Sequence, residues 1–417
     1  MSVNADNLAA TEDGTLKSAV LDYIAKVKSG DIGALPAFLG LITLGLVFTF
    51  SSQFFLTARN IANLITQSTP VMVIAMGLVF VLLLGEIDLS AGFASGVCGA
   101  TMVLLINDHK FPWYAALAVS IIVGIALGWF MGTLVARLRI PSFVVTLSTF
   151  LAFQGILLLM AGNGGTILLQ DRFIIAVENN NLTPFVSWIF SIIGLTIYVG
   201  LGLNRILHRR RKNLKSEPFN VWLIKNGALV IIGLGLTYVL SLQRGNPPNS
   251  SIKGIPIVVP VLLALLVAGT FLLNRTIFGR HLYAVGGNAE AARRSGINVR
   301  RVRTIAFMIC SGLAAIAGML FASISNSISP TTGGGTTLLY AVGAAVIGGT
   351  SLFGGKGKLR DAILGGLVVA VINNGMGLLG FSPGTQYLVT GGVLLVSASV
   401  DALSRKGANV SLSLIHI

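Results

Sequence analysis

Gly279 to Arg303, GRHLYAVGGNAEAARRSGINVRRVR, is a polar and strongly basic stretch between two long apolar segments, 255–274 and 304–326. A transmembrane helix needs about 20 mostly apolar residues, so this stretch marks a place where the chain leaves the lipid and then returns to it. Short loops rich in Lys and Arg lie on the cytoplasmic side of a membrane. We therefore expect a cytoplasmic loop, 275–303, long enough to contact another molecule.

The composition of the whole chain agrees with a membrane protein. Of the 417 residues, 54% are hydrophobic and only 10% are charged, whereas soluble domains carry about 25% charged residues. A net charge of +15 could suit a nucleic-acid partner, but the apolar content excludes that class. Cys98 and Cys310 both lie in apolar runs, so neither a disulfide framework nor a metal site is expected.

Apolar segments of spanning character recur along the chain. They predict an all-α polytopic membrane protein with ten to twelve transmembrane helices, the short or closely spaced ones being broken or re-entrant, as in 64–106. The segments are 35–52, 64–84, 89–106, 113–136, 143–161, 185–204, 220–242, 255–274, 304–326, 338–352, 361–380 and 386–403.

The distribution of basic residues orients these segments. With the N-terminus inside and the spans alternating, 24 of the 29 Lys and Arg residues fall on the inner side and five on the outer side. This is the bias of the positive-inside rule, so both termini are expected in the cytoplasm. The outer loops 162–184, 243–254 and 327–337 are short and rich in turn residues, so no extracytoplasmic domain is expected.

Polar tails flank the predicted transmembrane domain, 35–403. The N-terminal tail, 1–34, carries an apolar stripe from Leu16 to Val27 among lysines, which fits either an amphipathic helix on the inner membrane surface or a solvated tail. In the C-terminal tail, 404–417, the last seven residues from Ser411 have a foreign character. We expect them to be an artefact and assign them no function.

A short helix is predicted inside the basic loop. Asn288 is a good N-cap, Glu290 favours the first turn, and Gly296 suits the left-handed position after the last turn. Small side chains would let this helix dock closely against another protein, and its arginines would pair with carboxylates there. The alternative is an ordinary connecting loop that is basic only because it lies inside. The residues concerned are Asn288, Glu290, Ala291, Ala292, Arg293, Arg294 and Gly296.

Acidic and hydroxyl residues interrupt the second and third apolar segments at Glu86, Asp88 and Ser90. Ionisable groups between apolar segments are candidates for function. Asp88 or Ser90 could equally cap the next helix. The same turn, Gly85–Gly92, is echoed by Gly348–Gly355, which fits either two repeated halves or a shared need for glycine in tight turns.

The predicted spans carry neutral polar side chains and almost no ionisable ones. Gln154, Asn326, Asn373 and Asn374 suit a path for a neutral polyhydroxylated substrate, or simply hydrogen bonds between helices. An ion-coupled secondary carrier of small polar solutes is the alternative, although such a carrier usually needs ionisable residues in its core. A membrane scaffold without transport would leave the basic loop unexplained.

The chain has no nucleotide site of its own. The glycine-rich stretch Gly349–Lys358, GTSLFGGKGK, does not have the spacing of a phosphate-binding loop, and Gly357 follows Lys356 where Ser or Thr is required. No catalytic residue, metal or cofactor is therefore expected in this chain.

Taken together, these motifs resemble the sugar permeases of bacterial ABC importers, the branch that handles ribose, xylose, galactose and arabinose. The resemblance covers about residues 36–403, and the EIDLS and GGNAEAARRSGINV sequences are similar to the xylose-type subgroup. The motifs that carry it are Gly85–Gly92, Pro141–Leu157, Gly279–Val299, Val346–Leu352 and Asn373–Gly377.

The resemblance implies a transport role rather than an enzymatic one. It implies a homodimer in the bacterial inner membrane, a cytoplasmic ABC ATPase that binds ATP and Mg²⁺ below it, and an extracytoplasmic sugar-binding protein above. It also implies that the helix around Glu290 couples the ATPase to the permease. In the wider family, the motif that begins with Glu290-Ala291-Ala292 continues to an Ile-x-Leu-Pro end, which is missing here. The resemblance indicates the class of sugar better than the identity of the sugar.

Overall fold

In the computed structural model, the described residues are 33–162, 165–212, 218–245 and 251–413. The possible amphipathic helix of the N-terminal tail and the end of the chain after Ser413 lie outside them. The chain divides into two compact units. The larger comprises 33–181 and 256–403, and the smaller includes the segment 182–255.

The larger unit is almost entirely helical. Its first helices are α2 (Leu35–Ser51), α3 (Ala58–Leu82), α4 (Ala91–Asn107), α5 (Trp113–Leu138), α6 (Ser142–Ala161) and α7 (Arg172–Asn179). After the smaller unit come α10 (Val258–Arg275), α11 (Ile277–Gly287), α12 (Ala289–Arg294), α13 (Val299–Ser325), α14 (Gly335–Ile347), α15 (Leu359–Leu378) and α16 (Pro383–Ser413). The strands β1 (Ile167–Leu168) and β2 (Ser327–Ile328) pair antiparallel, with Ile167 opposite Ile328.

Every predicted apolar segment coincides with a helix, so the expectation of an all-α membrane protein is confirmed. Eight helices in the described part of the chain are long and apolar enough to cross a bilayer. Three further apolar helices, α2, α4 and α14, have 17, 17 and 13 residues, at or below the lower end of the length of about 17–25 residues that a span needs. Whether they are re-entrant, and on which side of the membrane the termini lie, stay predictions.

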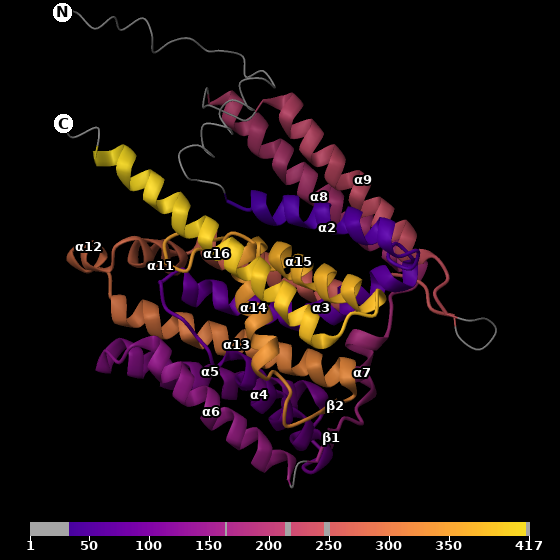
Figure 1. The fold of residues 1–417 in the computed structure, drawn as a ribbon, viewed down its shortest axis with the longest axis horizontal. Helices are drawn as coiled ribbons and strands as arrows, with labels where there is room; N and C mark the ends of the chain where they lie inside the picture. Colours follow the sequence, from indigo (N-terminus) through magenta and orange to yellow (C-terminus); the bar gives the residue numbers. More distant parts are fainter. Residues whose placement is uncertain (1–32, 163–164, 213–217, 246–250, 414–417) are drawn as a thin grey trace, which may run out of the picture. The chain divides into compact units, whose positions relative to one another are not determined.

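Helix α13 lies at the centre of the larger unit, where α3, α4 and α5 pack around it (Figure 1). The backbones approach so closely that a Cβ atom at Gly318 of α13 would lie 2.1 Å from the Ser95 carbonyl oxygen of α4. Likewise a Cβ atom at Gly128 of α5 would lie 2.3 Å from the Phe307 carbonyl oxygen. Small residues at helix contacts are typical of packing in membranes, where dispersion and not water exclusion drives association.

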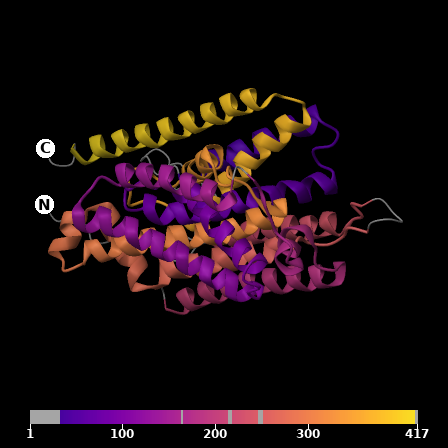
Figure 2. The ribbon, with the colours of Figure 1, turned by 90° about the horizontal axis from the view of Figure 1, so that it is seen from below.

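The C-terminal helices cover one side of this unit. Helix α15 packs against α14, α3 and α2, and an amide pair joins α3 to α15: Asn60 Nδ2 donates to Asn374 Oδ1 and Asn374 Nδ2 donates to Asn60 Oδ1, both at 2.8 Å. The first part of α16 runs along the outside of the larger unit (Figure 2). Leu388, Leu395 and Val396 of α16 are 63–78% exposed, as expected of side chains that face lipid or another subunit.

The smaller unit is a helical hairpin of α8 (Pro184–Arg211) and α9 (Phe219–Ser241). Pro184 at the start of α8 and the Thr183 hydroxyl, which accepts from Val186 N, define its first turn. Between the two helices, the Ser191 and Thr237 hydroxyl oxygens are 2.6 Å apart. Only Ser187 and Ile206 of α8 are buried, so this long apolar helix leaves most of its surface for contact with lipid.

A buried carboxyl lies where α7 meets the end of α13. Asp171 caps α7 by accepting from Phe173 N and Ile174 N, both at 2.9 Å, and Glu178 in its last turn is 5% exposed. Neither carboxyl oxygen of Glu178 has a hydrogen-bond partner among the described residues. Because burial disfavours the charged form, the pKa of Glu178 rises from 4.5 to about 9.

Replacing Glu178 with glutamine is expected to stabilise the protein increasingly as the pH rises from 5 to 9. Above pH 4.5 the unfolded chain loses this proton while the folded chain retains it up to about pH 9, so wild-type stability falls through this range. The neutral amide removes that loss, by at most about 1.4 kcal/mol for each pH unit. Thermal unfolding in detergent at pH 5, 7 and 9 measures the effect.

Asp108→Asn is the matched control, because Asp108 is an exposed carboxyl at the end of α4. It removes one negative charge without changing a buried site. A constant difference between Glu178→Gln and wild type across the three pH values would contradict the expected burial of a neutral Glu178.

Candidate functional site

The basic loop of the sequence folds into two short helices between α10 and α13. Helix α11 begins after Thr276, whose hydroxyl accepts from Gly279 N at 3.2 Å. It ends at Gly287, and Asn288 separates it from α12. Leu282 and Val285 of α11 are buried in the core of the larger unit, so these helices are attached firmly to the transmembrane bundle.

The predicted caps of α12 are confirmed. Asn288 Oδ1 accepts from Glu290 N at 3.1 Å and from Ala291 N at 2.9 Å. At the other end Gly296 has φ +85°, Gly296 N donates to Arg293 O, and Ile297 N donates to Ala292 O, both at 3.0 Å. This is a Schellman motif, and it holds a helix of only six residues in a defined shape.

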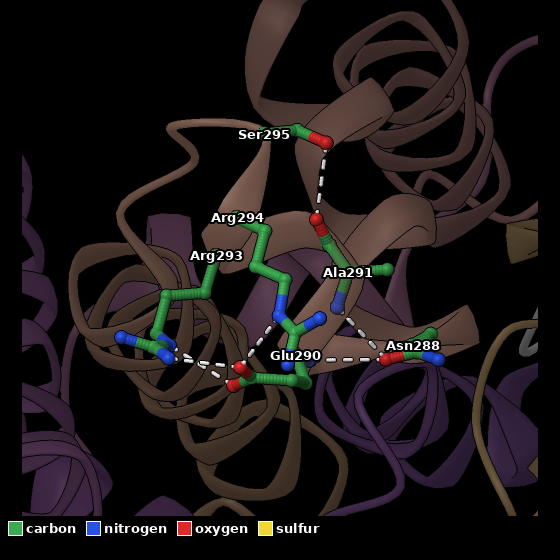
Figure 3. A network of polar contacts seen from close by, with 6 residues as sticks. All are labelled: Asn288, Glu290, Ala291, Arg293, Arg294 and Ser295. Atoms are coloured by element: carbon green, nitrogen blue, oxygen red, sulfur yellow. Dashed lines mark hydrogen bonds and ion pairs between the residues drawn. The ribbon is translucent and has the colours of Figure 1, made fainter.

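The charged side chains of α12 form a small exposed network (Figure 3). Arg293 Nε and Nη2 donate to the two Glu290 carboxylate oxygens at 2.9 and 2.8 Å, and Arg294 Nε donates to Oε1 at 3.0 Å. These bonds hold the pKa of Glu290 at about 2, well below its usual value. The carboxylate is therefore ionised, and the three residues together carry a net charge of +1.

The arginines are thus engaged within their own helix, a feature that the sequence analysis did not anticipate. All three side chains are more than half exposed, and ion pairs in such positions are individually weak. An incoming carboxylate could replace Glu290 at either arginine with little loss. The network orients the guanidinium groups while leaving them available to a partner.

Two neighbouring alanines of α12, Ala291 and Ala292, differ in their exposure to solvent. Ala291 is exposed, whereas Ala292 is only 6% exposed and belongs to the core of the larger unit. A partner that approaches this helix from solvent would therefore meet Glu290, Ala291, Arg293 and Arg294. Ala292 instead attaches the helix to its own chain.

The turn between α3 and α4 contacts the start of α13, the helix that follows α12 in the chain. Glu86 Oε1 lies 3.1 Å from Arg303 Nε in the first turns of α13, and both side chains are largely buried. Asp88 is fully buried and accepts from the backbone N and hydroxyl of Ser90 at 2.9 and 2.6 Å. Asp88 thus binds the residue that precedes α4, and Ser90, which occupies the N-cap position, makes no side-chain cap of its own.

The second glycine-rich turn meets the first one. Gly355 N donates to Leu83 O at 2.8 Å, and Gly85 and Gly354 have φ of +72° and +82°. A Cβ atom at Gly85 would lie 3.3 Å from the Phe353 carbonyl oxygen. The two turns therefore lie in contact, and each contains a glycine in the left-handed region of the backbone.

The four polar residues predicted for a substrate path are not brought together. Gln154 is exposed on α6, and Asn326 ends α13 with φ +53°. Asn373 and Asn374 of α15 line one cavity, which contains neither of the other two. The same cavity is lined by Gln67, Tyr340, Gln386 and Tyr387, which the sequence analysis missed. A polar run that includes Gln67, Gln67-Ser68-Thr69-Pro70 within an apolar helix, was the available signal.

Comparison with known proteins agrees with these features. Residues 60–398 match the family model described as branched-chain amino acid transport system / permease component. The chain is 34% identical over 381 residues to the xylose transport system permease protein XylH of Escherichia coli K12, covering 91% of this chain and 94% of the relative. The XylH of Haemophilus influenzae is also 34% identical, over 89% of this chain and 97% of its own length.

A more distant relative is the ribose import permease protein RbsC of Escherichia coli K12, with 29% identity over 87% of this chain and 91% of the relative. No solved structure matches the chain. The match to the family model spans most of the sequence and includes α12 and both glycine-rich turns. The chain therefore belongs to the branched-chain amino acid transport system / permease component family, and its predicted resemblance to the sugar permeases of ABC importers is confirmed.

Proposed function

We propose that this chain is the permease subunit of an ATP-driven importer that moves D-xylose or a related pentose across a bacterial inner membrane. In this proposal two copies of the chain form the pathway. A cytoplasmic ABC ATPase dimer supplies the energy with ATP and Mg²⁺, and an extracytoplasmic sugar-binding protein delivers the sugar. The similarity to xylose permeases over nine tenths of the chain is the observation that carries the proposal.

The proposed coupling site is α12. ATP-driven closure of the partner ATPases would push on the exposed residues Glu290, Ala291, Arg293 and Arg294. The capped ends of α12 and the buried Ala292 make the helix stiff enough to transmit that movement. Because Arg303 near the start of α13 pairs with Glu86, movement of α12 would also reach the turn between α3 and α4.

An ion-coupled secondary carrier remains the alternative, and the placement of the buried acids argues against it. Asp88 is bound to Ser90, and Asp361 at the start of α15 accepts from Lys358 N at 2.7 Å. These two carboxylates lie at helix termini, the third buried acid, Glu178, lies near the end of the short helix α7, and none of the three lines the cavity formed by α3, α14, α15 and α16. A carrier would need an ionisable group that faces the substrate or the coupling ion.

Uptake into proteoliposomes tests the proposal. The chain would be reconstituted with an ABC ATPase and a sugar-binding protein of the same system, and uptake of radiolabelled xylose, arabinose and ribose would be compared. We expect uptake only when all three proteins and ATP are present, with xylose fastest. Uptake by this chain alone on a proton or sodium gradient would overturn the proposal in favour of a carrier.

A further inference from the structure

A cavity of about 470 Å³ lies between α3, α14, α15 and α16 of the larger unit. Its size is in the range of sites that bind small molecules, about 300–1,000 Å³. Nothing in the proposed coupling mechanism uses it. Its walls come from helices that are far apart in the sequence, so it forms only when the C-terminal helices pack against α3.

The chemistry of the lining is that of a site for a neutral, hydroxyl-rich ring. No Asp, Glu, Lys, Arg or His contributes to it, so a charged solute would find no counter-charge. The amides of Gln67, Asn373 and Gln386 each offer donors and an acceptor. The rings of Tyr340 and Tyr387 offer flat apolar faces with polar tips.

One lining group lacks a partner. Asn373 Nδ2 donates to Val369 O at 3.1 Å, while Asn373 Oδ1 is buried and accepts no hydrogen bond from any described residue. Tyr340 of α14 lies within hydrogen-bonding reach of this amide, and Asn373 Oδ1 is enclosed by its neighbours. A buried acceptor without a donor is costly, and a ligand hydroxyl would satisfy it once a small side-chain movement opens the oxygen to the cavity.

The neighbouring Asn374 differs although it lines the same cavity. Its amide is committed to Asn60 through two hydrogen bonds of 2.8 Å. It therefore holds α15 against α3, whereas the Asn373 side-chain oxygen accepts no hydrogen bond from the described residues. Asn374 thus helps to build the wall of the cavity, whereas the side-chain oxygen of Asn373 keeps its capacity to accept a hydrogen bond from a ligand.

We infer that this cavity binds the transported sugar within the permease, with Asn373 accepting from a sugar hydroxyl and the two tyrosines flanking the ring. The inference rests on the proposed function for the identity of the ligand. It makes the permease itself selective for neutral sugars, in addition to any selection by the binding protein. Charged sugar derivatives of the same size would be excluded because the cavity offers them no compensating charge.

Protection of an introduced cysteine tests binding without any partner protein. Ala370→Cys, at a lining position without a polar side chain, would be alkylated in the full chain, in lipid nanodiscs, with and without xylose; the native Cys98 and Cys310 are buried. At a xylose concentration well above Kd we expect labelling to slow at least about threefold, because occupancy reduces the accessible fraction as 1/(1 + [L]/Kd). Glucuronate, which carries a carboxylate on the same pyranose ring, should give no protection.

Ser399→Cys is the matched control, because Ser399 is exposed on α16 and does not line the cavity. Its labelling rate should not change with either compound. If xylose leaves the rate at Ala370→Cys unchanged, or if glucuronate slows it equally, the cavity does not select a neutral sugar and the inference is wrong.

Two variants then connect the cavity to transport. Asn373→Leu, of similar size, and Tyr340→Phe, which removes only a hydroxyl, should each lower xylose uptake by the full importer, by about tenfold for Asn373→Leu as for the loss of a buried hydrogen bond. ATP-driven uptake by wild type with no xylose protection would overturn the inference alone. Protection without ATP-driven uptake would overturn the proposed importer and leave the cavity as a sugar site.

Discussion

Ala291→Trp is expected to lower ATP-driven sugar uptake at least about 100-fold while leaving the permease folded. Ala291 is exposed on α12, between Glu290 and Arg293, which are also exposed and which the proposed function places against the ATPase. An indole in this position would hold the ATPase away from the helix, and a loss of about 3 kcal/mol in docking corresponds to a factor of 100. Uptake into proteoliposomes and ATPase activity, measured on the same preparation, would detect the uncoupling.

Three further substitutions in α12 define the effect. Ala291→Ser keeps the side chain small and should retain uptake, whereas Glu290→Lys replaces the acceptor of Arg293 and Arg294 with a third positive charge and should also uncouple. Ala292→Trp is expected to reduce the folded yield instead, because Ala292 is buried in the chain's own core. Normal coupling in Ala291→Trp would show that α12 is not the contact with the ATPase.

Gly365→Ala is expected to destabilise the permease by at least about 3 kcal/mol, more than most overpacked sites. A Cβ atom at Gly365 of α15 would lie 1.8 Å from the Ala344 carbonyl oxygen of α14 and 2.8 Å from Gly348 N. Both obstacles are backbone atoms, so the two helices would have to separate. Thermal unfolding in detergent and the yield of folded protein from membranes would measure the loss.

Gly377→Ala on the same helix is the matched control. No atom lies within 4 Å of a Cβ atom at Gly377, and its backbone is not left-handed. Alanine favours a helix over glycine by about 1 kcal/mol, so this variant should be as stable as wild type or slightly more stable. Equal unfolding temperatures for the two variants would contradict the close contact between α14 and α15.

The positions of the helices could be predicted because hydropathy over about 20 residues is a local property of the chain. The boundaries were less accurate: α8 continues to Arg211, seven residues beyond the predicted segment, and α13 begins at Val299 rather than at 304. Basic residues can continue a helix beyond the lipid, where their long side chains reach water. Hydropathy marks the lipid boundary and not the end of the helix.

Capping could also be predicted, because it depends on residues within one or two turns. Asn288 and Gly296 define α12 in the structure as they did in the sequence. The internal pairing of Glu290 with both arginines was missed, although their spacings of three and four residues favour such pairs. Those arginines were predicted to pair with carboxylates of a partner, although Glu290 of the same helix is a nearer acceptor.

By itself, the sequence determined that this protein is a bundle of membrane-spanning helices with a capped, basic helix between two of them. Only the tertiary structure decided which side of each helix faces inward: that Ala292 is buried and Ala291 exposed, and that Asn374 binds Asn60 while Asn373 faces a cavity. A helix that is apolar on all sides carries no pattern to indicate its buried face. That face depends on contacts with helices hundreds of residues away in the chain, such as α3 against α15.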